Sequence, residues 1–458
     1  MINGETSHWM RQSARRERPA LDGDTVADVC VIGAGYTGLW TAYWLTRALP
    51  DASVVVVEAE HVGYGASGRN GGWLSGKMIG LPRQLAKGPG GRRAVADLRR
   101  AASEAIDEVI GLMARHGVDI DAVHSGYLQI ARTPSELARM RASVEADHAL
   151  GLSEKDVRLL SAEETYERIH VEGVLGAAQS PHCARIDPAK LVLGLADVAE
   201  RAGVRIVERS PATAVSPGRV VTPNGTVRAR HVLRATEGYT PTLPRLKRAV
   251  LPMNSSMIVT EPLHERSWDA IGWDACETLS GAQHTYFYAQ RTADGRIAIG
   301  GRGLPYRFGS RIDDNGRLDS LTIHHLHSVL TDLWPGVDLP IAHAWCGVLA
   351  VPRDWTPSVT YNSTTRMGQA GGYAGQGVTA AYLAGHSLAD LVAGRDTHYT
   401  RLPWTQRRAR TWEPEPLRWL GSYATYALYR SADAVEHRTE GDRTSPLAHF
   451  ADTLSGRH

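Results

Sequence analysis

The hydrophobic pattern near the start of the chain changes period twice within a short stretch. Val29 to Ile32 form an apolar, mostly β-branched run, which is typical of a buried parallel strand. A glycine-rich turn and a helical segment follow, and Val54 to Val57 form a second apolar run that ends at Glu58. The order of strand, turn, helix, strand and acid predicts the start of a nucleotide-binding sheet.

The pattern farther along the chain predicts more helices and strands of the same sheet. Apolar residues at helical spacing predict amphipathic helices at residues 92–116, 134–151 and 188–202. Short apolar runs predict strands at residues 127–131, 204–208 and 232–235. The sequence Pro223-Asn224-Gly225 before the last of these runs predicts a hairpin.

Residues 245–348 have a different pattern, with short strands separated by turns, which predicts an antiparallel sheet. The fold class we expect is therefore α/β, with a discontinuous Rossmann-like domain into which an α+β substrate domain is inserted. The first domain takes residues 25–80, 180–240 and 345–395, and the inserted domain takes residues 81–179 and 241–344. Residues 396–458 are expected to form a helical C-terminal tail.

The tail is rich in arginine and tryptophan, and one segment in it has apolar residues at helical spacing. These are Leu417, Leu420, Tyr423, Ala424, Ala427 and Leu428. A membrane-surface belt and a helix packed on the body both fit this pattern. We favour packing on the body, because aromatic stripes at this spacing are usually part of a core.

The glycine-rich turn has the spacing of a dinucleotide site. Gly33 permits a tight turn, Gly35 lets backbone approach a pyrophosphate, and Gly38 lets the helix pack on the sheet. Tyr36 and Thr37 lie at the start of the helix, where free N–H groups favour an anion. Glu58 is placed to accept the ribose hydroxyls. A glycine loop that binds no nucleotide is the alternative.

A second run of small residues and donors begins at Gly65, a few residues after Glu58. Its members Ala66, Ser67, Arg69, Asn70, Gly71 and Gly72 are expected to contact the cofactor. A nicotinamide dinucleotide does not need such a loop, whereas a flavin must lie close to backbone over its whole length. The second loop therefore favours FAD.

Composition excludes several other classes of function. The chain has 51 basic and 49 acidic residues, which implies no nucleic-acid partner. Its four cysteines are far apart, which argues against a zinc site or a disulfide framework and fits a reducing cytoplasm. We find no targeting signal and no apolar run long enough for a membrane span, and expect no metal.

Motifs along most of the chain identify a resemblance to a known family. Residues 183–188 read CARIDP, residues 231–239 read HVLRATEGY, and residues 368–385 read GQAGGYAGQGVTAAYLAG. With residues 251–263 and 295–303, they resemble the D-amino-acid oxidase and glycine oxidase superfamily of FAD-dependent oxidoreductases, in the branch of the gamma-glutamylputrescine oxidases. The resemblance covers residues 7 to 395.

The resemblance implies further contacts to FAD. They involve Ala212, Ala235, Thr236 and Gly238 in the middle of the chain, and Gly372, Tyr373, Gly375, Gln376, Gly377 and Val378 in a loop that precedes a helix. Backbone N–H groups of this loop would stabilise negative charge on a reduced flavin. We expect non-covalent FAD, with attachment through Cys346, as in sarcosine oxidases, as the alternative.

The resemblance implies oxidation of a carbon–nitrogen bond in an amine or amino acid, with hydride transfer to flavin N5. Candidate residues around the substrate are Tyr286 and Tyr288, which could line a cage for an amine, Arg302, whose fork suits a carboxylate, and Tyr373. Core packing and structural ion pairs are equally compatible with these residues. Oxygen, giving hydrogen peroxide, is the expected acceptor; a dehydrogenase with another acceptor and a flavin-binding sensor subunit are the alternatives.

Overall fold

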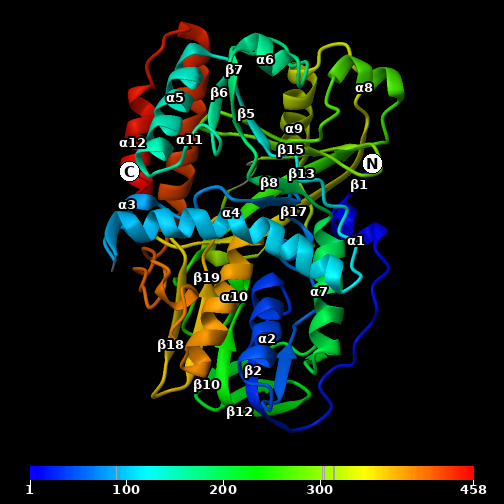
Figure 1. Cartoon of the computed structure of the whole chain (residues 1–458), viewed down its shortest axis with the longest axis vertical. Helices are drawn as coiled ribbons and strands as arrows, with labels where there is room; N and C mark the ends of the chain where they lie inside the picture. The colour runs from blue at the N-terminus through cyan, green and yellow to red at the C-terminus, as the bar shows by residue number, and fades with distance from the viewer. Residues whose placement is uncertain (89, 302, 304, 313–314, 458) are drawn as a thin grey trace.

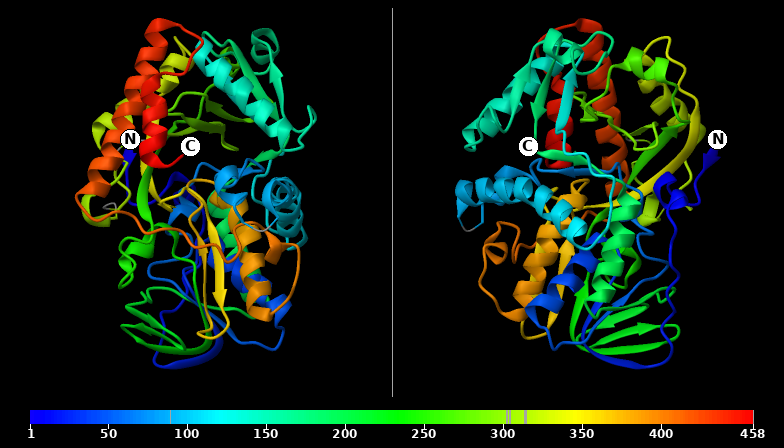
Figure 2. Two further views of the ribbon diagram at one scale, coloured as in Figure 1. Left: turned by 90° about the vertical axis from the view of Figure 1, so that its left-hand side faces the viewer. Right: turned by 45° about the vertical axis from the view of Figure 1, so that its right-hand side comes forward.

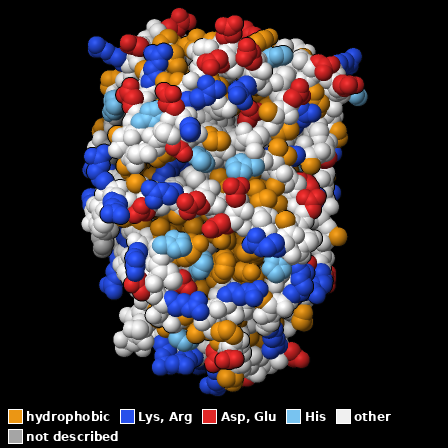
Figure 3. All heavy atoms as spheres, in the orientation of Figure 1, with side chains coloured by type: hydrophobic (Ala, Val, Ile, Leu, Met, Phe, Trp, Pro, Cys, Tyr) orange, Lys and Arg blue, Asp and Glu red, His pale blue; other side chains and the backbone are white. Residues whose placement is uncertain are grey.

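The computed structural model describes residues 1–88, 90–301, 303, 305–312 and 315–457. It has two halves that are stacked along the long axis, each built on one large sheet (Figure 1). The long helix α4 (Gly91–Arg115) runs across the boundary between the halves in the views of Figures 1 and 2. On the face shown in Figure 3, acidic and basic side chains are interspersed.

The lower half in Figure 1 contains an eight-stranded sheet in the order β10-β11-β12-β2-β3-β9, with β19 between β12 and β18. Its strands are β2 (Thr25–Ile32), β3 (Val54–Val57), β9 (Arg205–Val207), β10 (Ala214–Ser216), β11 (Arg219–Thr222), β12 (Gly225–Arg234), β18 (Ser358–Asn362) and β19 (Met367–Gly371). The central pairs β2–β3, β3–β9, β12–β2 and β12–β19 are parallel. This is the parallel sheet that the apolar runs predicted.

Helices α2 (Tyr36–Ala48), α7 (Pro188–Arg201) and α10 (Gly377–Ala393) pack together beside this sheet. Val29 and Val31 of β2 face one hydrophobic core with α2 and α10, whereas Cys30 and Ile32 face a second core. Because both faces of β2 are buried from Val29 to Ile32, this part of the strand is continuously apolar.

The upper half contains a nine-stranded sheet in the order β1-β17-β13-β16-β15-β14-β5-β7-β6. Its strands are β1 (Ile2–Asn3), β5 (Tyr127–Ala131), β6 (Arg158–Leu160), β7 (Gly176–Ser180), β13 (Leu251–Thr260), β14 (Thr278–Gly281), β15 (Tyr288–Arg291), β16 (Ile297–Gly301) and β17 (Ile341–Val351). The sheet is antiparallel except at two places, where β1 pairs with β17 and β5 pairs with β14 in parallel. The expected antiparallel sheet thus holds for its central strands, while strands from earlier parts of the chain join in parallel.

The remaining elements surround this sheet or connect the halves. The helices are α1 (His8–Gln12), α3 (Pro82–Leu85), α5 (Pro134–Ala149), α6 (Ala162–Tyr166), α8 (Glu265–Ile271), α9 (Ser320–Leu333), α11 (Leu417–Thr439) and α12 (Pro446–Ser455), with short 3-10 turns η1 (Ala66–Gly68), η2 (Glu237–Thr242), η3 (Phe308–Ser310) and η4 (Tyr399–Arg401). Strands β4 (Trp73–Ser75) and β8 (Cys183–Arg185) form a separate antiparallel pair.

The C-terminal helix α11 packs on the body, but with a different face from the one expected. Leu417 and Leu420 are 60% and 51% exposed, whereas Arg418 is buried and its guanidinium donates to Glu415 and to Lys247 O. Tyr426 joins a core with Leu251. The expected face was wrong at Leu417, Leu420, Ala424 and Ala427, which are exposed; the buried face of the helix contains Arg418, Ser422, Thr425, Tyr426 and Tyr429 instead. Among the described residues, no helix is long and apolar enough to cross a membrane.

Candidate active site

The turn between β2 and α2 leaves no space for side chains at its glycines. Gly33 has φ +105°, and a Cβ added there would lie 2.6 Å from Ala235 O. A Cβ on Gly38 would lie 1.9 Å from Gly33 O. These close approaches bring the N-terminus of α2 to the carboxyl edge of β2 and β12, which is where a parallel sheet binds its ligand.

The second glycine loop lies directly against the start of α2. The backbone N–H of Tyr36 donates to Ser67 Oγ over 2.8 Å. The Asn70 amide donates to Ala66 O and Ser67 O and accepts from the Gly72 N–H, so it holds the loop closed. These contacts join the two glycine motifs into one surface.

Arg69 fixes this loop to the other half of the molecule. Its guanidinium is buried, and it donates to Tyr64 O over 2.9 Å and to Cys346 O over 3.0 Å. The indole of Trp345 in β17 donates to Arg69 O. Arg69 therefore spans the boundary between the FAD-type motif and the upper sheet.

Glu58 lies at the end of β3, beside the glycine turn. Its carboxylate accepts from the Ala34 N–H over 2.7 Å and from the Glu60 N–H over 3.1 Å. Burial raises the pKa of Glu58 above its usual value. The acid is therefore held at the turn, as the motif predicted.

The predicted contacts in the middle of the chain lie at two places. The Ala235 N–H donates to Ile32 O, and Gly238 packs so closely on β17 that a Cβ would lie 2.7 Å from Val348 O. Thr236 Oγ1 is 2.9 Å from Thr240 Oγ1. Ala212, in contrast, lies in the connection between β9 and β10 and packs on the core that contains Cys30.

The loop of residues 372–376 connects β19 to α10, which begins at Gly377. Gly375, Gln376 and Val378 line a chamber that also contacts the second glycine loop. The Tyr373 side chain is buried against α2, with its hydroxyl 3.1 Å from Thr37 Oγ1. The expectation that Tyr373 faces a substrate needs correction, because this side chain points into the core and does not line the chamber.

The chamber has a volume of about 310 Å³ and lies between the two halves. One side consists of residues from the second glycine loop and the start of α10, including Ala66, Asn70, Gly71 and Thr379. The other side consists of residues from the upper sheet and from β4, including Tyr286, Tyr288, Ser255, Ser280, Gln129, Trp73 and Lys77. The structure thus brings Tyr286 and Tyr288 together with the glycine loops.

Two further predicted residues remain, Arg302 and Cys346. Arg302 falls outside the described residues. Cys346 alternates along β17 with Trp345 and Gly347, of which Trp345 bonds to Arg69 and Gly347 lines the chamber. Because successive side chains of a strand point to opposite faces, the Cys346 thiol faces away from the chamber.

Sequence reasoning missed Glu237, which lies between two predicted residues. Its buried carboxylate accepts from the backbone N–H groups of Gly372, Tyr373 and Ala350, each over 3.1 Å. Burial raises the pKa of Glu237 to about 7, and these three hydrogen bonds oppose the shift. The residue ties the loop before α10 to β17. The sequence signal that could have found it was an acid three residues after the end of a buried strand, β12.

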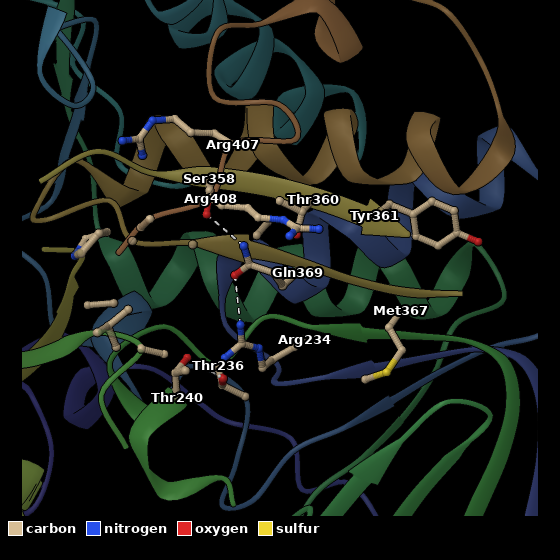
Figure 4. A pocket seen from close by; sticks show the side chains of 18 of the residues that line it. Arg234, Thr236, Thr240, Ser358, Thr360, Tyr361, Met367, Gln369, Arg407 and Arg408 are labelled. Carbon is tan, nitrogen blue, oxygen red and sulfur yellow. Dashed lines mark hydrogen bonds between the residues drawn. The ribbon is translucent and has the colours of Figure 1, made fainter. Parts of the chain in front are cut away.

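A second cavity, of about 640 Å³, lies on the other side of this loop (Figure 4). Figure 4 shows Arg234 pointing to Gln369, whose amide in turn donates to Ser358 Oγ. Of the predicted site residues, Thr236 and Gly372 line this cavity. We place the chemistry in the smaller chamber, because the second glycine loop, the loop before α10 and both predicted tyrosines line it.

Comparisons with known proteins agree with this geometry. A family profile described as FAD dependent oxidoreductase matches residues 28–391. The chain belongs to this family. Gamma-glutamylputrescine oxidoreductase of Escherichia coli (strain K12) is 31% identical over 399 residues, which cover 85% of this chain and 89% of that protein.

Solved structures agree on the fold. Glycine oxidase from Geobacillus kaustophilus superposes with a TM-score of 0.70 at 20% identity, covering 84% of this chain and 99% of that one. L-proline dehydrogenase from P. horikoshii has a TM-score of 0.66 at 20% identity, covering 84% and 98%. The predicted family, fold class and FAD cofactor are confirmed. The glycine cradle and the helix N-terminus fit this dinucleotide, whereas covalent attachment at Cys346 stays untested.

We predict that Glu237→Gln loosens the loop before α10. An amide offers one oxygen where the carboxylate offers two, so a backbone N–H of this set loses its partner at a cost of about 1–3 kcal/mol. We expect a lower melting temperature and weaker FAD binding at pH 5. Because the folded pKa of Glu237 is raised from 4.5 to about 7, wild type loses stability as the pH rises between these values, so its lead in melting temperature over Glu237→Gln should be smaller at pH 8 than at pH 5. Thermal melts at both pH values with flavin fluorescence check this, and equal FAD affinity would contradict it.

Proposed function

We propose that this protein oxidises a carbon–nitrogen bond in an amine or amino acid to an imine, with oxygen as the acceptor. The observation that carries the proposal is the chamber between the glycine loops and the upper sheet, lined by Tyr286 and Tyr288. The similarity to gamma-glutamylputrescine oxidoreductase and to glycine oxidase supports this substrate class.

We propose that the cofactor is held by the residues of the two glycine motifs, the η2 turn and the loop before α10. These are Gly33, Gly35, Tyr36, Thr37, Gly38, Glu58, Ala66, Ser67, Arg69, Asn70, Gly71, Gly72, Ala235, Thr236, Gly238, Gly372, Gly375, Gln376, Gly377 and Val378. When bound, FAD supplies the two-electron acceptor that takes a hydride from the α-carbon. The free N–H groups at the start of α10 favour negative charge beside that acceptor.

The chain's own residues orient and enclose the substrate. Tyr288 Oη lies 2.8 Å from Ser255 Oγ, so the ring is fixed against β13. Among the described residues that line the chamber there is no Asp, Glu or His. The chamber therefore favours a neutral amine. Its N–H proton leaves to solvent as the imine forms, and the imine is hydrolysed afterwards. Orientation of the α-carbon is the main contribution we assign to the protein.

An anaerobic absorbance experiment tests the proposal. The holoprotein is mixed in turn with primary amines, N-methyl amino acids, D-amino acids and proline-like rings. Bleaching of the flavin by one class, followed by recovery and peroxide release on admission of air, is the expected result. If the absorbance of the oxidised flavin returned only slowly in air, the acceptor would be a compound other than oxygen. A flavin that no compound reduces would overturn the proposed function.

We predict that Tyr288→Phe lowers the rate of flavin reduction about fivefold, because one orienting hydrogen bond contributes about 1 kcal/mol. Ser255 loses its partner across the chamber in this variant. Tyr166→Phe is the matched control, since Tyr166 is 54% exposed and stacks on His170 in the substrate domain. If stopped-flow traces gave the same rate of flavin reduction for Tyr288→Phe and wild type, Tyr288 would not be a residue of the substrate site.

A further inference from the structure

The larger cavity, of about 640 Å³, is separate from the chamber and has no part in the proposed function. Its wall is formed by the end of β12, by β18 and β19, and by the chain between residues 406 and 411. Gly371 and Gly372 line this cavity, whereas Gly375 and Gln376 of the same loop line the chamber. A cavity of this volume is large enough for a small-molecule ligand.

We propose that this cavity binds the phosphate group of a small molecule, with Arg234 as the central contact and Arg408 at the rim. The site is distinct from the substrate chamber, so the inference goes beyond the proposed function and does not depend on it.

Arg234, the last residue of β12, has a donor that the protein leaves unused. Its Nη1 is buried and has no hydrogen-bond partner among the described residues. Burial lowers the pKa of Arg234 to about 10, so the guanidinium still carries its charge at neutral pH. A buried charged donor without an acceptor is costly, and an anion in the cavity would supply the acceptor.

Gln369 of β19 holds the Arg234 guanidinium in place inside the cavity. The Arg234 Nη2 donates to Gln369 Oε1 over 3.1 Å, and the Gln369 amide donates to Ser358 Oγ over 2.9 Å (Figure 4). Because this chain of contacts uses Nη2, the Nη1 edge is the one left for a ligand. A guanidinium that is already oriented loses little freedom when it binds an anion.

The charge of the cavity wall favours an anion. Its charged side chains are those of Arg234, Arg407, Arg408 and Glu237. Arg407 is already paired with Asp354. The Glu237 carboxylate accepts from three backbone N–H groups and is therefore turned toward the loop before α10 and β17. Arg234 and Arg408 are thus the charged groups that remain for a ligand.

Arg408 supplies a second guanidinium at the opening of the cavity. Its side chain is exposed and makes no hydrogen bond or ion pair within the part of the chain that the structure describes. In the view of Figure 4, Arg408 and Arg234 lie on opposite sides of Gln369. Two arginines that converge on one polar cavity are typical of phosphate recognition.

Hydroxyl groups in the wall favour phosphate over a carboxylate. Ser358 and Thr360 of β18 and Thr236 and Thr240 at η2 all line the cavity (Figure 4). Ser358 Oγ accepts from Gln369, and a hydroxyl that accepts a hydrogen bond still has its own hydrogen to donate. A phosphate group offers three strong acceptor oxygens and more charge than a carboxylate, so it can use guanidinium and hydroxyl donors together.

The first test measures binding to the holoprotein by calorimetry, with inorganic phosphate, phenyl phosphate and acetate as probes. We expect both phosphates to bind, and acetate to bind at least about tenfold more weakly. Tighter binding of phenyl phosphate would assign the site to a phosphate ester, and tighter binding of inorganic phosphate would assign it to the free ion. Acetate that binds as tightly as both phosphates would overturn the phosphate assignment.

The second test locates the binding site. Arg234→Met should weaken phosphate at least about tenfold, and Arg408→Met at least about threefold, because each removes a charge-assisted donor. Since Arg408 is exposed, its variant should fold like wild type, which circular dichroism checks. Arg230→Met is the matched control, because Arg230 lies on the same strand β12, is exposed and does not line the cavity.

Phosphate affinity that is equal in wild type, Arg234→Met and Arg408→Met would overturn the site, as would a wild type that binds no phosphate; the cavity would then hold only water. A decrease in Arg408→Met alone would place the phosphate on the surface and refute the role of Arg234. Neither test measures amine oxidation. Phosphate binding that depends on Arg234 would therefore stand even if the proposed function failed.

Discussion

Gly35→Val should yield a folded protein whose FAD affinity is at least about 100-fold lower, equivalent to about 2.7 kcal/mol. Gly35 caps α2 with φ −85°, a conformation that valine can adopt, so the backbone need not change. A Cβ there would nevertheless lie 2.8 Å from Ser67 Oγ, the atom that joins the two glycine loops. The added methyl groups would fill the surface on which we place the pyrophosphate.

The measurement is the ratio of flavin to protein absorbance after reconstitution, together with circular dichroism to confirm the fold. Gly421→Val is the matched control, because a Cβ at Gly421 in α11 has no heavy atom within 4 Å. Full flavin content in Gly35→Val would place the cofactor on a different surface. A lower flavin content in both Gly35→Val and Gly421→Val would indicate a general loss of stability.

The parts of this fold that could be predicted are those where local sequence and tertiary structure demand the same residues. The apolar runs of β2 and β3 are buried on both faces, and the glycines at 33 and 38 are required by atoms within 3 Å. Strand β5 was predicted at its observed bounds for the same reason. At such positions the local sequence is enough to predict the structure.

The parts that could not be predicted depend on partners far away in the chain. Lys77 reads as a surface lysine in a polar loop, and only the packing of β5 and β14 around it makes it part of a chamber. Tyr373 was expected to face the substrate because it is the large side chain of a small-residue loop, but Thr37 and α2 hold it in the core. The buried face of α11 likewise depends on Glu415, which pairs with Arg418. Pattern alone does not encode these contacts.

One buried carboxylate, that of Glu436, is expected to make a large contribution to the stability of the fold by holding the C-terminal tail. Glu436 in α11 is 4% exposed and accepts from Ser135 Oγ, Arg139 Nη1, His284 Nε2 and the Ser445 N–H over 2.6–3.0 Å. These donors come from α5, from the loop before β15 and from the start of α12. The carboxylate therefore holds the tail against the upper half of the molecule.

We predict that Glu436→Ala destabilises the protein by about 3–5 kcal/mol, because it leaves a partly buried guanidinium and three other donors without their acceptor. His437→Ala, at an exposed neighbour in α11, is the control and should melt like wild type. Since Arg457 of the same tail lines the chamber, KM for the substrate should rise more than kcat falls. Equal melting temperatures of Glu436→Ala and wild type at pH 7 would show that the tail is held by its apolar contacts instead.

The pH dependence gives this prediction a signature that a simple packing defect lacks. Burial alone would raise the pKa of Glu436, but the bonds from Ser445, His284 and Arg139 outweigh it and lower the pKa to about 2. A carboxylate with a depressed pKa stabilises the fold above its unfolded value near 4.5 and loses that contribution as the pH falls toward about 2. The difference in unfolding free energy between wild type and Glu436→Ala should thus be constant from pH 8 to 6 and shrink below about pH 4.5. Denaturant titrations at pH 7 and pH 3.5 measure it, and a difference independent of pH would assign the loss to packing and not to charge.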